Sequence, residues 1–311
     1  MTERARAAPK PRSSRAKSRD ARVESVHTPL DFARDERILV RVSESLVGAA
    51  AQLAESSDTP RLDAELLMAH ALGVTREEML LRRLHDPVPE AFGTLLARRL
   101  AAEPVAYITG CRAFWTIEVE VGPGALVPRP DSETLIEAAL AHFGEAGPAT
   151  VLDLGTGPGT LLLAALAQWH DATGVGIDAS QAALAYARRN AERLGLGGRA
   201  DFRVGDWVQG LAGRFDLILC NPPYVEEGAP LPRDVADWEP AQALFAGADG
   251  LDDYRRLAPA LGPLLAPAGV ACIEIGARQF DAVASLFRDA GFTIAARKDL
   301  SGRDRCLIAT R

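Results

Sequence analysis

The sequence predicts an α/β protein in which a mostly parallel, seven-stranded sheet follows a small N-terminal helical bundle and a connecting β-hairpin. From Thr150 onward, short apolar runs alternate with helical patterns, which indicates a parallel sheet with helices on both faces. Residues 36–110 show helical periodicity alone, and residues 111–130, which join the two regions, include a stretch of period two. A chain of 311 residues is long enough to form two domains, each with its own core.

The first 35 residues differ from the rest of the chain. Residues 1–35 are rich in Arg, Ala, Ser and Pro and nearly free of large apolar side chains. Such a segment buries too little surface to offset its ordering entropy, so we predict a disordered basic tail. Its composition favours a solubilising or miscalled N-terminus over a transit peptide or an electrostatic contact.

Charge is distributed unevenly along the chain. Residues 1–22 carry eight Lys or Arg and two acids, a local charge of +6, which leaves 27 basic and 40 acidic residues, or −13, for the rest. A body that acidic is a poor electrostatic partner for phosphate backbones. The charge therefore counts against a nucleic acid as a direct partner.

Localisation and metal binding are constrained by what the sequence lacks. No apolar run approaches the roughly 20 residues of a membrane helix, and no apolar segment follows the basic start as in a secretory signal. The four cysteines are far apart without a CxxC pair, and the five histidines form no HExxH motif. We therefore expect a cytoplasmic protein with no membrane partner, in a reducing compartment, and no metal site.

Helix signals recur through residues 36–110. Thr59-Pro60 offers an N-cap followed by proline at the first helical position. Thr75 to Glu78 reads as a capping box, and Pro89 begins a further helix. The segment carries no chemistry of its own, so packing or partner recognition is its expected role.

The period changes to two at Phe114. We predict a hairpin whose first strand is residues 114–121, whose turn is Gly122-Pro123-Gly124 and whose second strand is residues 125–127. Asp131 is expected to cap the following helix, which opens the domain of residues 131–311. A structural role, as a stiff hinge followed by a helix cap, is enough to explain the residues from the hairpin to Asp131 without a role in the active site.

Seven strands are expected in the second domain. They are residues 151–154, 173–177, 200–204, 215–220, 270–275, 292–297 and 305–310. Helices are expected after the first strand, over about 180–195, over 251–265 and up to about 290, whereas residues 225–249 contain no clear element and read as a loop.

A glycine-rich turn follows the first of these strands. Its residues are Gly155, Thr156, Gly157, Pro158 and Gly159. The spacing is GxGxG rather than the GxGxxG of a nicotinamide site. Glycines let the backbone approach a ligand closely, and this turn need not cradle a pyrophosphate. It suits a ligand whose charged end is an amino-acid group.

Polar residues also end the next two strands. Asp178 can accept hydrogen bonds from both ribose hydroxyls, and Asp206 and Trp207 can hydrogen-bond and stack an adenine. Each alone could be a turn acid or a core aromatic, but three such sites at consecutive strand ends are hard to attribute to chance. An amino-acid end, a ribose and an adenine without pyrophosphate match S-adenosylmethionine.

The fourth strand ends in a rigid polar corner, Asn221-Pro222-Pro223-Tyr224. Open α/β sheets place ligands at this edge. An amide, two prolines and an aromatic ring can hold a planar, nitrogen-bearing group while it receives a methyl group. The corner alone does not separate adenine, guanine and glutamine as the acceptor.

A longer set of segments carries a family resemblance. They are Glu103-Pro104-Val105-Ala106-Tyr107-Ile108-Thr109-Gly110, Phe114-Trp115, Val127-Pro128-Arg129-Pro130-Asp131, Glu239-Pro240, Asp249-Gly250-Leu251-Asp252 and Glu274-Ile275-Gly276. With the glycine turn and the corner, they resemble the HemK/PrmC family over about residues 40–311. Ser132 is a conservative departure, because threonine is usual there.

The resemblance implies a class I, Rossmann-like methyltransferase that uses S-adenosylmethionine. Its expected reaction is methylation of the N5 amide nitrogen of the glutamine in the GGQ motif of peptide chain release factors. The helical domain is then expected to recognise this protein substrate, and the enzyme to be a monomer. The sister family that methylates glutamine in ribosomal protein L3 shares several of these motifs. The segment from Asp299 to Arg305, and Ala64-Glu65-Leu66-Leu67, look more like the release-factor enzymes.

Two further classes remain as alternatives. A DNA or RNA base methyltransferase shares the corner, but we would expect it to carry a basic face or a target-recognition domain. A non-enzymatic nucleotide sensor would need the glycine turn without the corner. The acidic body disfavours the first class, and the intact corner disfavours the second.

Catalysis is expected to depend on positioning, because the corner supplies no general base. We expect Asn221, Pro222 and Tyr224 to be catalytic, and the same residues with Pro223 to bind the substrate. The Asn221 side-chain oxygen and the Pro222 carbonyl would accept the two amide N–H groups and aim the nitrogen lone pair. The donor-binding set is Gly155 to Gly159, Asp178, Asp206, Trp207 and Asn221.

Overall fold

The computed structural model describes residues 40–311. The predicted disordered tail, residues 1–35, lies outside this range. Within the described range, none of the helices combines the length and apolarity needed to cross a membrane.

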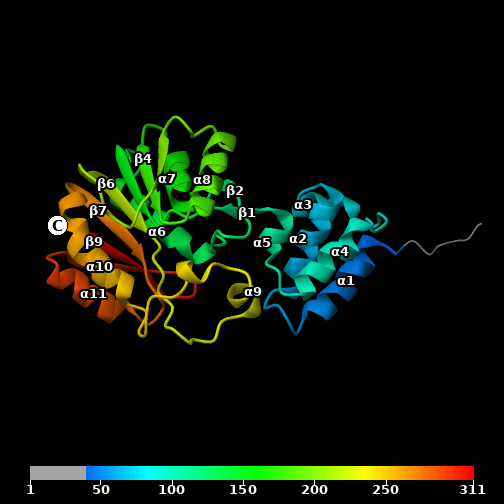
Figure 1. Cartoon of the computed structure of the whole chain (residues 1–311). Coiled ribbons are helices and arrows are strands. Elements are labelled where there is room, and N and C mark those ends of the chain that lie inside the picture. Colours follow the sequence, from blue (N-terminus) through cyan, green and yellow to red (C-terminus); the bar gives the residue numbers. More distant parts are fainter. Residues whose placement is uncertain (1–39) are drawn as a thin grey trace, which may run out of the picture. The chain divides into compact units, whose positions relative to one another are not determined.

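Short helices build the region before the hairpin (Figure 1). They are α1 Val42–Leu53, α2 Pro60–Leu72, α3 Arg76–Glu78, the π-helical turn η1 Met79–Arg83, α4 Ala91–Leu100 and α5 Val105–Thr109. Leu46 and Leu53 from α1 are fully buried with Leu67 and Met68 from α2 in one apolar core. The Thr75 hydroxyl accepts the backbone N–H of Glu78 at 3.1 Å, which confirms the predicted start of a helix there.

The hairpin is present, but its predicted strands and turn are wrong. Strand β1, Cys111–Phe114, pairs antiparallel with β2, Ile117–Glu120, so the turn lies at residues 115–116. Trp115 adopts a left-handed φ of 53°, which closes this short turn. Residues 125–127 form no strand. The prediction placed the turn at the glycines because a left-handed tryptophan has no sequence signal.

All seven predicted sheet strands are present (Figure 1). They are β3 Thr150–Leu154, β4 Thr173–Asp178, β5 Ala200–Val204, β6 Phe215–Cys220, β7 Leu265–Glu274, β8 Thr293–Lys298 and β9 Asp304–Thr310. The order is β5-β4-β3-β6-β7-β9-β8, and only β9 runs antiparallel to its neighbours β7 and β8. Strand β7 begins at Leu265, five residues before the predicted start.

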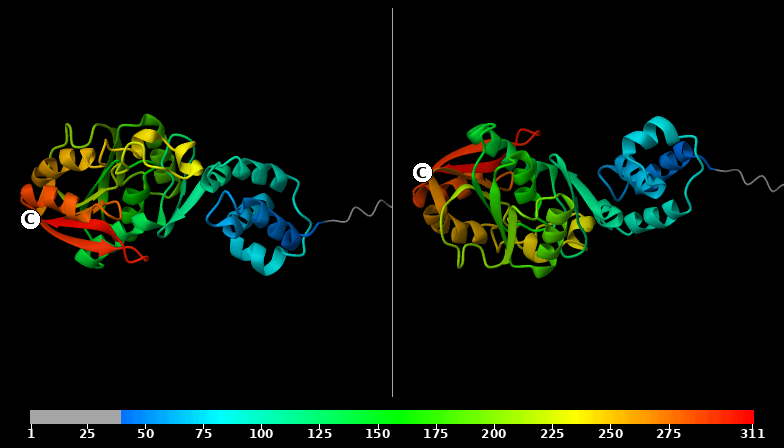
Figure 2. Two further views of the ribbon diagram at one scale, coloured as in Figure 1. Left: turned by 90° about the horizontal axis from the view of Figure 1, so that it is seen from below. Right: turned by 90° about the horizontal axis from the view of Figure 1, so that it is seen from above.

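Helices cover both faces of the sheet, as the alternating pattern predicts (Figures 1 and 2). On one face lie α6 Glu133–Phe143, α7 Thr160–Gln168 and α8 Gln181–Arg193, and on the other lie α10 Asp252–Leu261 and α11 Phe280–Asp289. Successive residues of β6 serve the two faces: Leu217 and Leu219 belong to the first core, and Ile218 and Cys220 to the second. A central strand buried on both faces explains its continuous apolar run.

The predicted loop over residues 225–249 contains two short elements, α9 Arg233–Ala236 and the 3-10 turn η3 Ala241–Ala243. Its buried Glu239 pairs with Arg129 and accepts the backbone N–H of Val127 at 3.2 Å. A buried carboxylate with these partners ties the loop to the segment after the hairpin.

The predicted capping role of Asp131 is wrong. Asp131 lies within the 3-10 turn η2, Pro130–Ser132, and α6 begins at Glu133 without a side-chain cap. The Asp131 carboxylate pairs instead with Arg305 of β9 at 3.1 Å. A contact between positions so far apart in the chain has no local sequence signal.

Position 250, which packs against the Tyr224 backbone, requires a glycine. Its φ is +69°, and a Cβ atom there would overlap the Tyr224 carbonyl oxygen and approach Gln279 Nε2 at 2.8 Å. We expect Gly250→Ala to lower the free energy of unfolding by about 2–5 kcal/mol, because backbone strain and overlap add. Gly210→Ala is the matched control: its φ is +73°, with no atom within 4 Å of the added Cβ. Urea unfolding should show about 1–2 kcal/mol for that control, and equal losses would contradict the overlap.

Candidate active site

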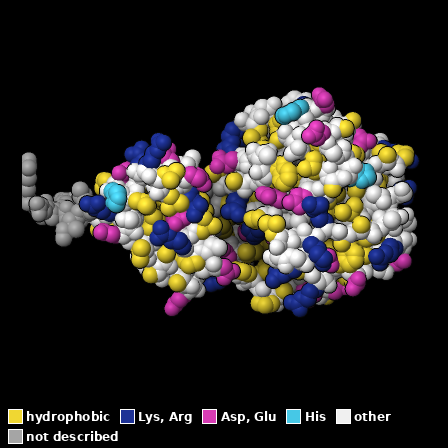
Figure 3. All heavy atoms as spheres, turned by 180° about the vertical axis from the view of Figure 1, so that it is seen from behind, with side chains coloured by type: hydrophobic (Ala, Val, Ile, Leu, Met, Phe, Trp, Pro, Cys, Tyr) yellow, Lys and Arg dark blue, Asp and Glu magenta, His cyan; other side chains and the backbone are white. Residues whose placement is uncertain are grey.

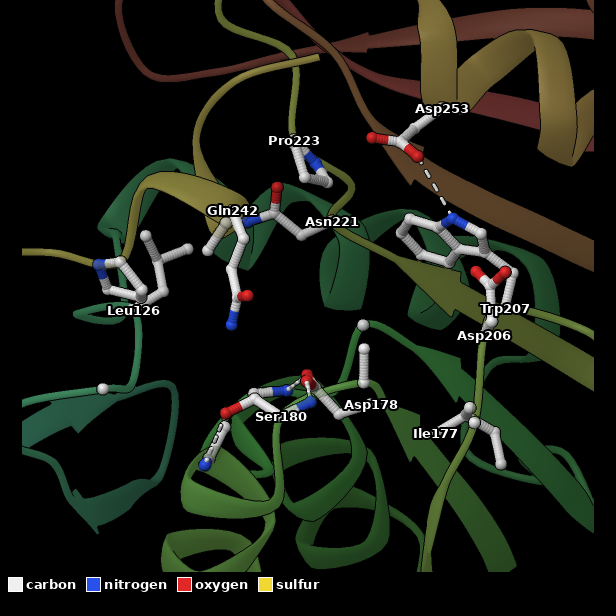
Figure 4. Close-up of a pocket in the computed structure, with 18 of the residues that line it drawn as sticks. Leu126, Ile177, Asp178, Ser180, Asp206, Trp207, Asn221, Pro223, Gln242 and Asp253 are labelled. Atoms are coloured by element: carbon white, nitrogen blue, oxygen red, sulfur yellow. Dashed lines mark hydrogen bonds between the residues drawn. The ribbon is translucent and has the colours of Figure 1, made fainter.

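A cavity of about 240 Å³ lies at the carboxyl ends of the central strands (Figure 4). The chain runs from β3 to β4 on one side and returns to β6 on the other, so this is the switch point of the sheet. The cavity brings together most of the predicted site residues, namely Gly155, Gly157, Asp178, Asp206, Trp207, Asn221 and Pro223. The residues predicted from separate strand ends therefore share one site.

The glycine turn approaches the cavity with its backbone. Gly155 and Gly157 line the cavity with φ of 70° and 56°, and a Cβ on Gly155 would lie 3.3 Å from the Trp207 ring. Thr156, Pro158 and Gly159, which are also predicted to bind the donor, are not among the lining residues.

Those three residues shape the turn. The Thr156 hydroxyl donates to Asp153 at 2.6 Å, the Pro158 carbonyl accepts from Asn190 at 2.9 Å, and Gly159 precedes α7 with a φ of 87°. Burial raises the pKa of Asp153 to about 7, and its bonds to the Thr156 hydroxyl and the Leu162 backbone oppose that rise. The turn is thus built on a buried carboxyl group that the sequence reading did not assign.

Asp178 stands opposite the corner across the cavity (Figure 4). Its Oδ1 accepts the Ser180 N–H at 2.7 Å, and its Oδ2 accepts the Gly157 N–H at 2.8 Å. Burial raises its pKa, and these two bonds oppose the rise. Each oxygen keeps a lone pair, so the carboxylate can still accept hydroxyl hydrogen bonds.

Asp253 of α10 lies beside Trp207 (Figure 4), and Arg256 of the same helix also lines the cavity. The Trp207 indole N–H donates to Asp253 at 3.1 Å, and Trp207 has a left-handed φ of 52°. Both oxygens of Asp206 accept from Arg256 at 2.6 Å, so Asp206 already has a cationic partner. The prediction missed Asp253 and Arg256, although Asp249-Gly250-Leu251-Asp252 directly precedes them.

The opposite wall comes from segments to which no site role was assigned. Leu126, from the segment after the hairpin, and Pro240, Gln242 and Ala243, from the loop, line the cavity. Figure 4 shows Gln242 and Leu126 on the far side from Trp207. Glu239-Pro240 is part of the family resemblance, but the sequence assigned it no part in the site. Nothing in the sequence singled out Gln242.

The corner divides into two parts. Asn221 and Pro223 line the cavity, whereas Pro222 and Tyr224 are not among its lining residues. The Asn221 Nδ2 donates to the Ser132 hydroxyl at 3.3 Å. The Tyr224 hydroxyl donates to Glu274 at 3.3 Å. Burial and the charge of Glu274 raise the pKa of the Tyr224 hydroxyl.

No group of three or more His, Cys, Asp or Glu side chains suited to a metal ion occurs among residues 40–311. None of the described residues that line the cavity is His or Cys.

A family model described as a methyltransferase domain matches residues 147–248, which include most of the cavity lining, and one described as the PrmC N-terminal domain matches residues 44–110. The protein is therefore a methyltransferase. The release factor glutamine methyltransferase from Rhodospirillum rubrum is 47% identical over 260 residues, which are 82% of this chain and 80% of the relative. The chain belongs to the family of release factor glutamine methyltransferases.

Two more relatives bear the same name. The Caulobacter vibrioides protein is 43% identical over 261 residues, covering 82% of this chain and 90% of its own. The Mycolicibacterium smegmatis protein is 39% identical over 283 residues, covering 88% of this chain and 99% of its own. The similarity therefore spans both the helical region and the methyltransferase domain.

Proposed function

We propose that this protein transfers a methyl group from S-adenosylmethionine to the N5 amide nitrogen of the GGQ glutamine in peptide chain release factors. The observation that carries the proposal is one cavity that Gly157 lines and in which Asn221 and Pro223 lie opposite Asp178 (Figure 4). It occurs in a chain that is 47% identical to a protein named for this activity.

The hydrogen-bonding groups and the open space of the cavity support binding of the methyl donor. The side chain that Gly155 lacks would crowd the Trp207 ring, so the glycine leaves this part of the cavity open. Gly155 and Gly157 would hold the amino-acid end, Asp178 the ribose, and Trp207 the adenine. When bound, the sulfonium compound supplies an electrophilic methyl group, and no metal is needed in this scheme.

The chain's part in the reaction is to orient the acceptor. An amide nitrogen is a weak nucleophile because its lone pair is delocalised. Asn221 Oδ1 and the Pro222 carbonyl would each accept one N–H of the glutamine side chain, which aims the lone pair toward the donor. The Tyr224 ring would pack on the flat amide. Such positioning is worth about 7–11 kcal/mol in favourable cases.

The face drawn in Figure 3 supports a protein substrate over a nucleic acid. On the face drawn in Figure 3, acidic side chains are interspersed with the basic ones instead of leaving a continuous basic band. A nucleic-acid enzyme is expected to concentrate Lys and Arg along the path of the phosphates. We therefore propose no direct nucleic-acid partner.

Labelled methyl transfer tests the function. Purified release factor, ribosomal protein L3 and plasmid DNA are offered side by side, with a release factor whose GGQ glutamine is replaced as the control. We expect label on the intact release factor alone. Label on L3 or DNA with none on the release factor would overturn the proposal.

A further inference from the structure

A buried carboxylate lies behind the corner and takes no part in the mechanism so far. Glu274, at the end of β7, is 1% exposed. Its Oε2 accepts the Ser132 hydroxyl at 2.5 Å, and its Oε1 accepts the Tyr224 hydroxyl at 3.3 Å. Ser132, itself 3% exposed, accepts Nδ2 of Asn221 at 3.3 Å. One carboxylate thus reaches two side chains of the corner.

The direction of these hydrogen bonds decides which atom of Asn221 is left over. A serine hydroxyl has one proton, and here it goes to the Glu274 carboxylate. The Ser132 oxygen can then only accept, so it must face the NH₂ group of Asn221 and not its carbonyl. Across the described part of the chain, Asn221 Oδ1 receives no hydrogen bond, which leaves it available for a substrate N–H.

We propose that Ser132 and Glu274 are positioning residues that set the Asn221 carboxamide with its oxygen toward the acceptor amide, and that Glu274 also fixes the Tyr224 ring. The inference rests on the proposed function, because it names what holds the acceptor groups in place. Neither residue lines the cavity, so both act through Asn221 and Tyr224.

The arrangement needs an ionised Glu274. Burial raises the pKa of Glu274 to about 7, opposed by the Ser132 hydrogen bond and the charge of Arg305, while Asp131 raises it further. The other polar groups facing it are Tyr224 and Tyr254, whose hydroxyl donates to the Glu274 main-chain oxygen at 2.8 Å, and the thiols of Cys220 and Cys306.

Protonation would reverse the chain of hydrogen bonds. A neutral Glu274 can donate to the Ser132 oxygen, and the serine proton is then free to bond Asn221 Oδ1. The amide would turn its oxygen away from the acceptor. The kcat of methyl transfer should therefore fall below about pH 7, by tenfold per pH unit at the acidic limit, if only the ionised form positions Asn221.

Three variants test the positioning role: Glu274→Gln, Ser132→Ala and Ser132→Thr. We expect kcat on the release factor to fall about 10–100-fold in Glu274→Gln and Ser132→Ala, the size of effect expected from misplacing an acceptor group. Ser132→Thr keeps the hydroxyl and should stay within about threefold of the wild type. Donor Kd by calorimetry should change less than about twofold in all three, since neither residue contacts the cavity.

The pH profile provides a readout that a purely structural role would leave unchanged. The wild-type kcat should rise with pH through about 7, and the Glu274→Gln profile should be flat there. Thermal unfolding identifies variants that fail to fold, and the Ser132 pair still tests the idea if Glu274→Gln is unstable. A wild-type kcat in Ser132→Ala, or an unchanged pH profile in Glu274→Gln, would overturn the proposal.

The same measurements separate this inference from the function on which it rests. If the wild type labels ribosomal protein L3 or DNA instead of the release factor, the proposed function fails. The kcat comparison then moves to the labelled acceptor and still decides the role of Ser132 and Glu274. If the wild type labels the release factor and the variants match it, only the positioning inference fails.

Discussion

Replacing Asn221 by alanine is expected to lower kcat for methyl transfer by about 10²–10³-fold, the loss measured when one preorganised polar contact is removed from an active site. Alanine removes the oxygen that would accept the substrate N–H, and it also removes the NH₂ group that donates to the Ser132 oxygen. Asp178, which would hold the donor ribose, lies on the opposite wall (Figure 4), so the donor Kd should change little.

Single-turnover kinetics with saturating donor measures the chemical step for Asn221→Ala, and calorimetry measures the donor Kd. Gln52→Ala is the matched control, because it also removes a side-chain amide, but from the exposed surface of α1, where the amide bonds only the Gly48 carbonyl. Near-normal turnover in Asn221→Ala would remove Asn221 from the acceptor role.

Asp178→Ala is expected to weaken donor binding by about 10–100-fold. The carboxylate holds the N–H groups of Gly157 and Ser180, so its loss frees two backbone donors and loosens the turn. Hydrogen bonds to a charged group contribute about 1.5–3 kcal/mol each, and the proposed ribose contacts are lost as well. Saturating donor should restore most of kcat, because Asn221 and its partners are untouched.

Calorimetric titration with S-adenosylmethionine measures the effect of Asp178→Ala. Asp171→Ala is the control, since it removes an exposed acid away from the cavity lining. Asp178→Asn should give a Kd between those of the wild type and Asp178→Ala. The asparagine has one acceptor oxygen where the carboxylate has two, so it can accept fewer hydrogen bonds. An unchanged affinity in Asp178→Ala would exclude the ribose role.

The sequence was most informative where local patterns decide the structure. The seven sheet strands were predictable from apolar runs, and the edge that carries the cavity was predictable because open α/β sheets bind ligands at the carboxyl ends of their strands. The hairpin register was missed because Trp115 makes the turn in a left-handed conformation that glycines usually supply. The early start of β7 was missed because Pro267 and Gly269 interrupt its apolar pattern.

The same distinction holds for the site. Gly155, Asp178 and Asn221 were predictable because each ends or follows a strand at the same edge of the sheet. Ser132 and Glu274 were not assigned roles, because they lie 142 positions apart and meet only in the folded chain. Their segments were visible as family signals, but the contact that gives them a role depends on tertiary structure.

The position of β9 has a consequence for how the site is completed during synthesis. Strand β9 follows β8 in the chain but lies between β7 and β8, and β8 pairs with β9 alone among the described strands. On the ribosome, β8 therefore emerges with no partner, and Arg305 reaches Asp131 only when β9 inserts. Insertion of β9 also brings the positive charge of Arg305 toward Glu274, where it opposes the rise in the Glu274 pKa. The last strand to be made thus favours the ionised carboxylate that our inference requires.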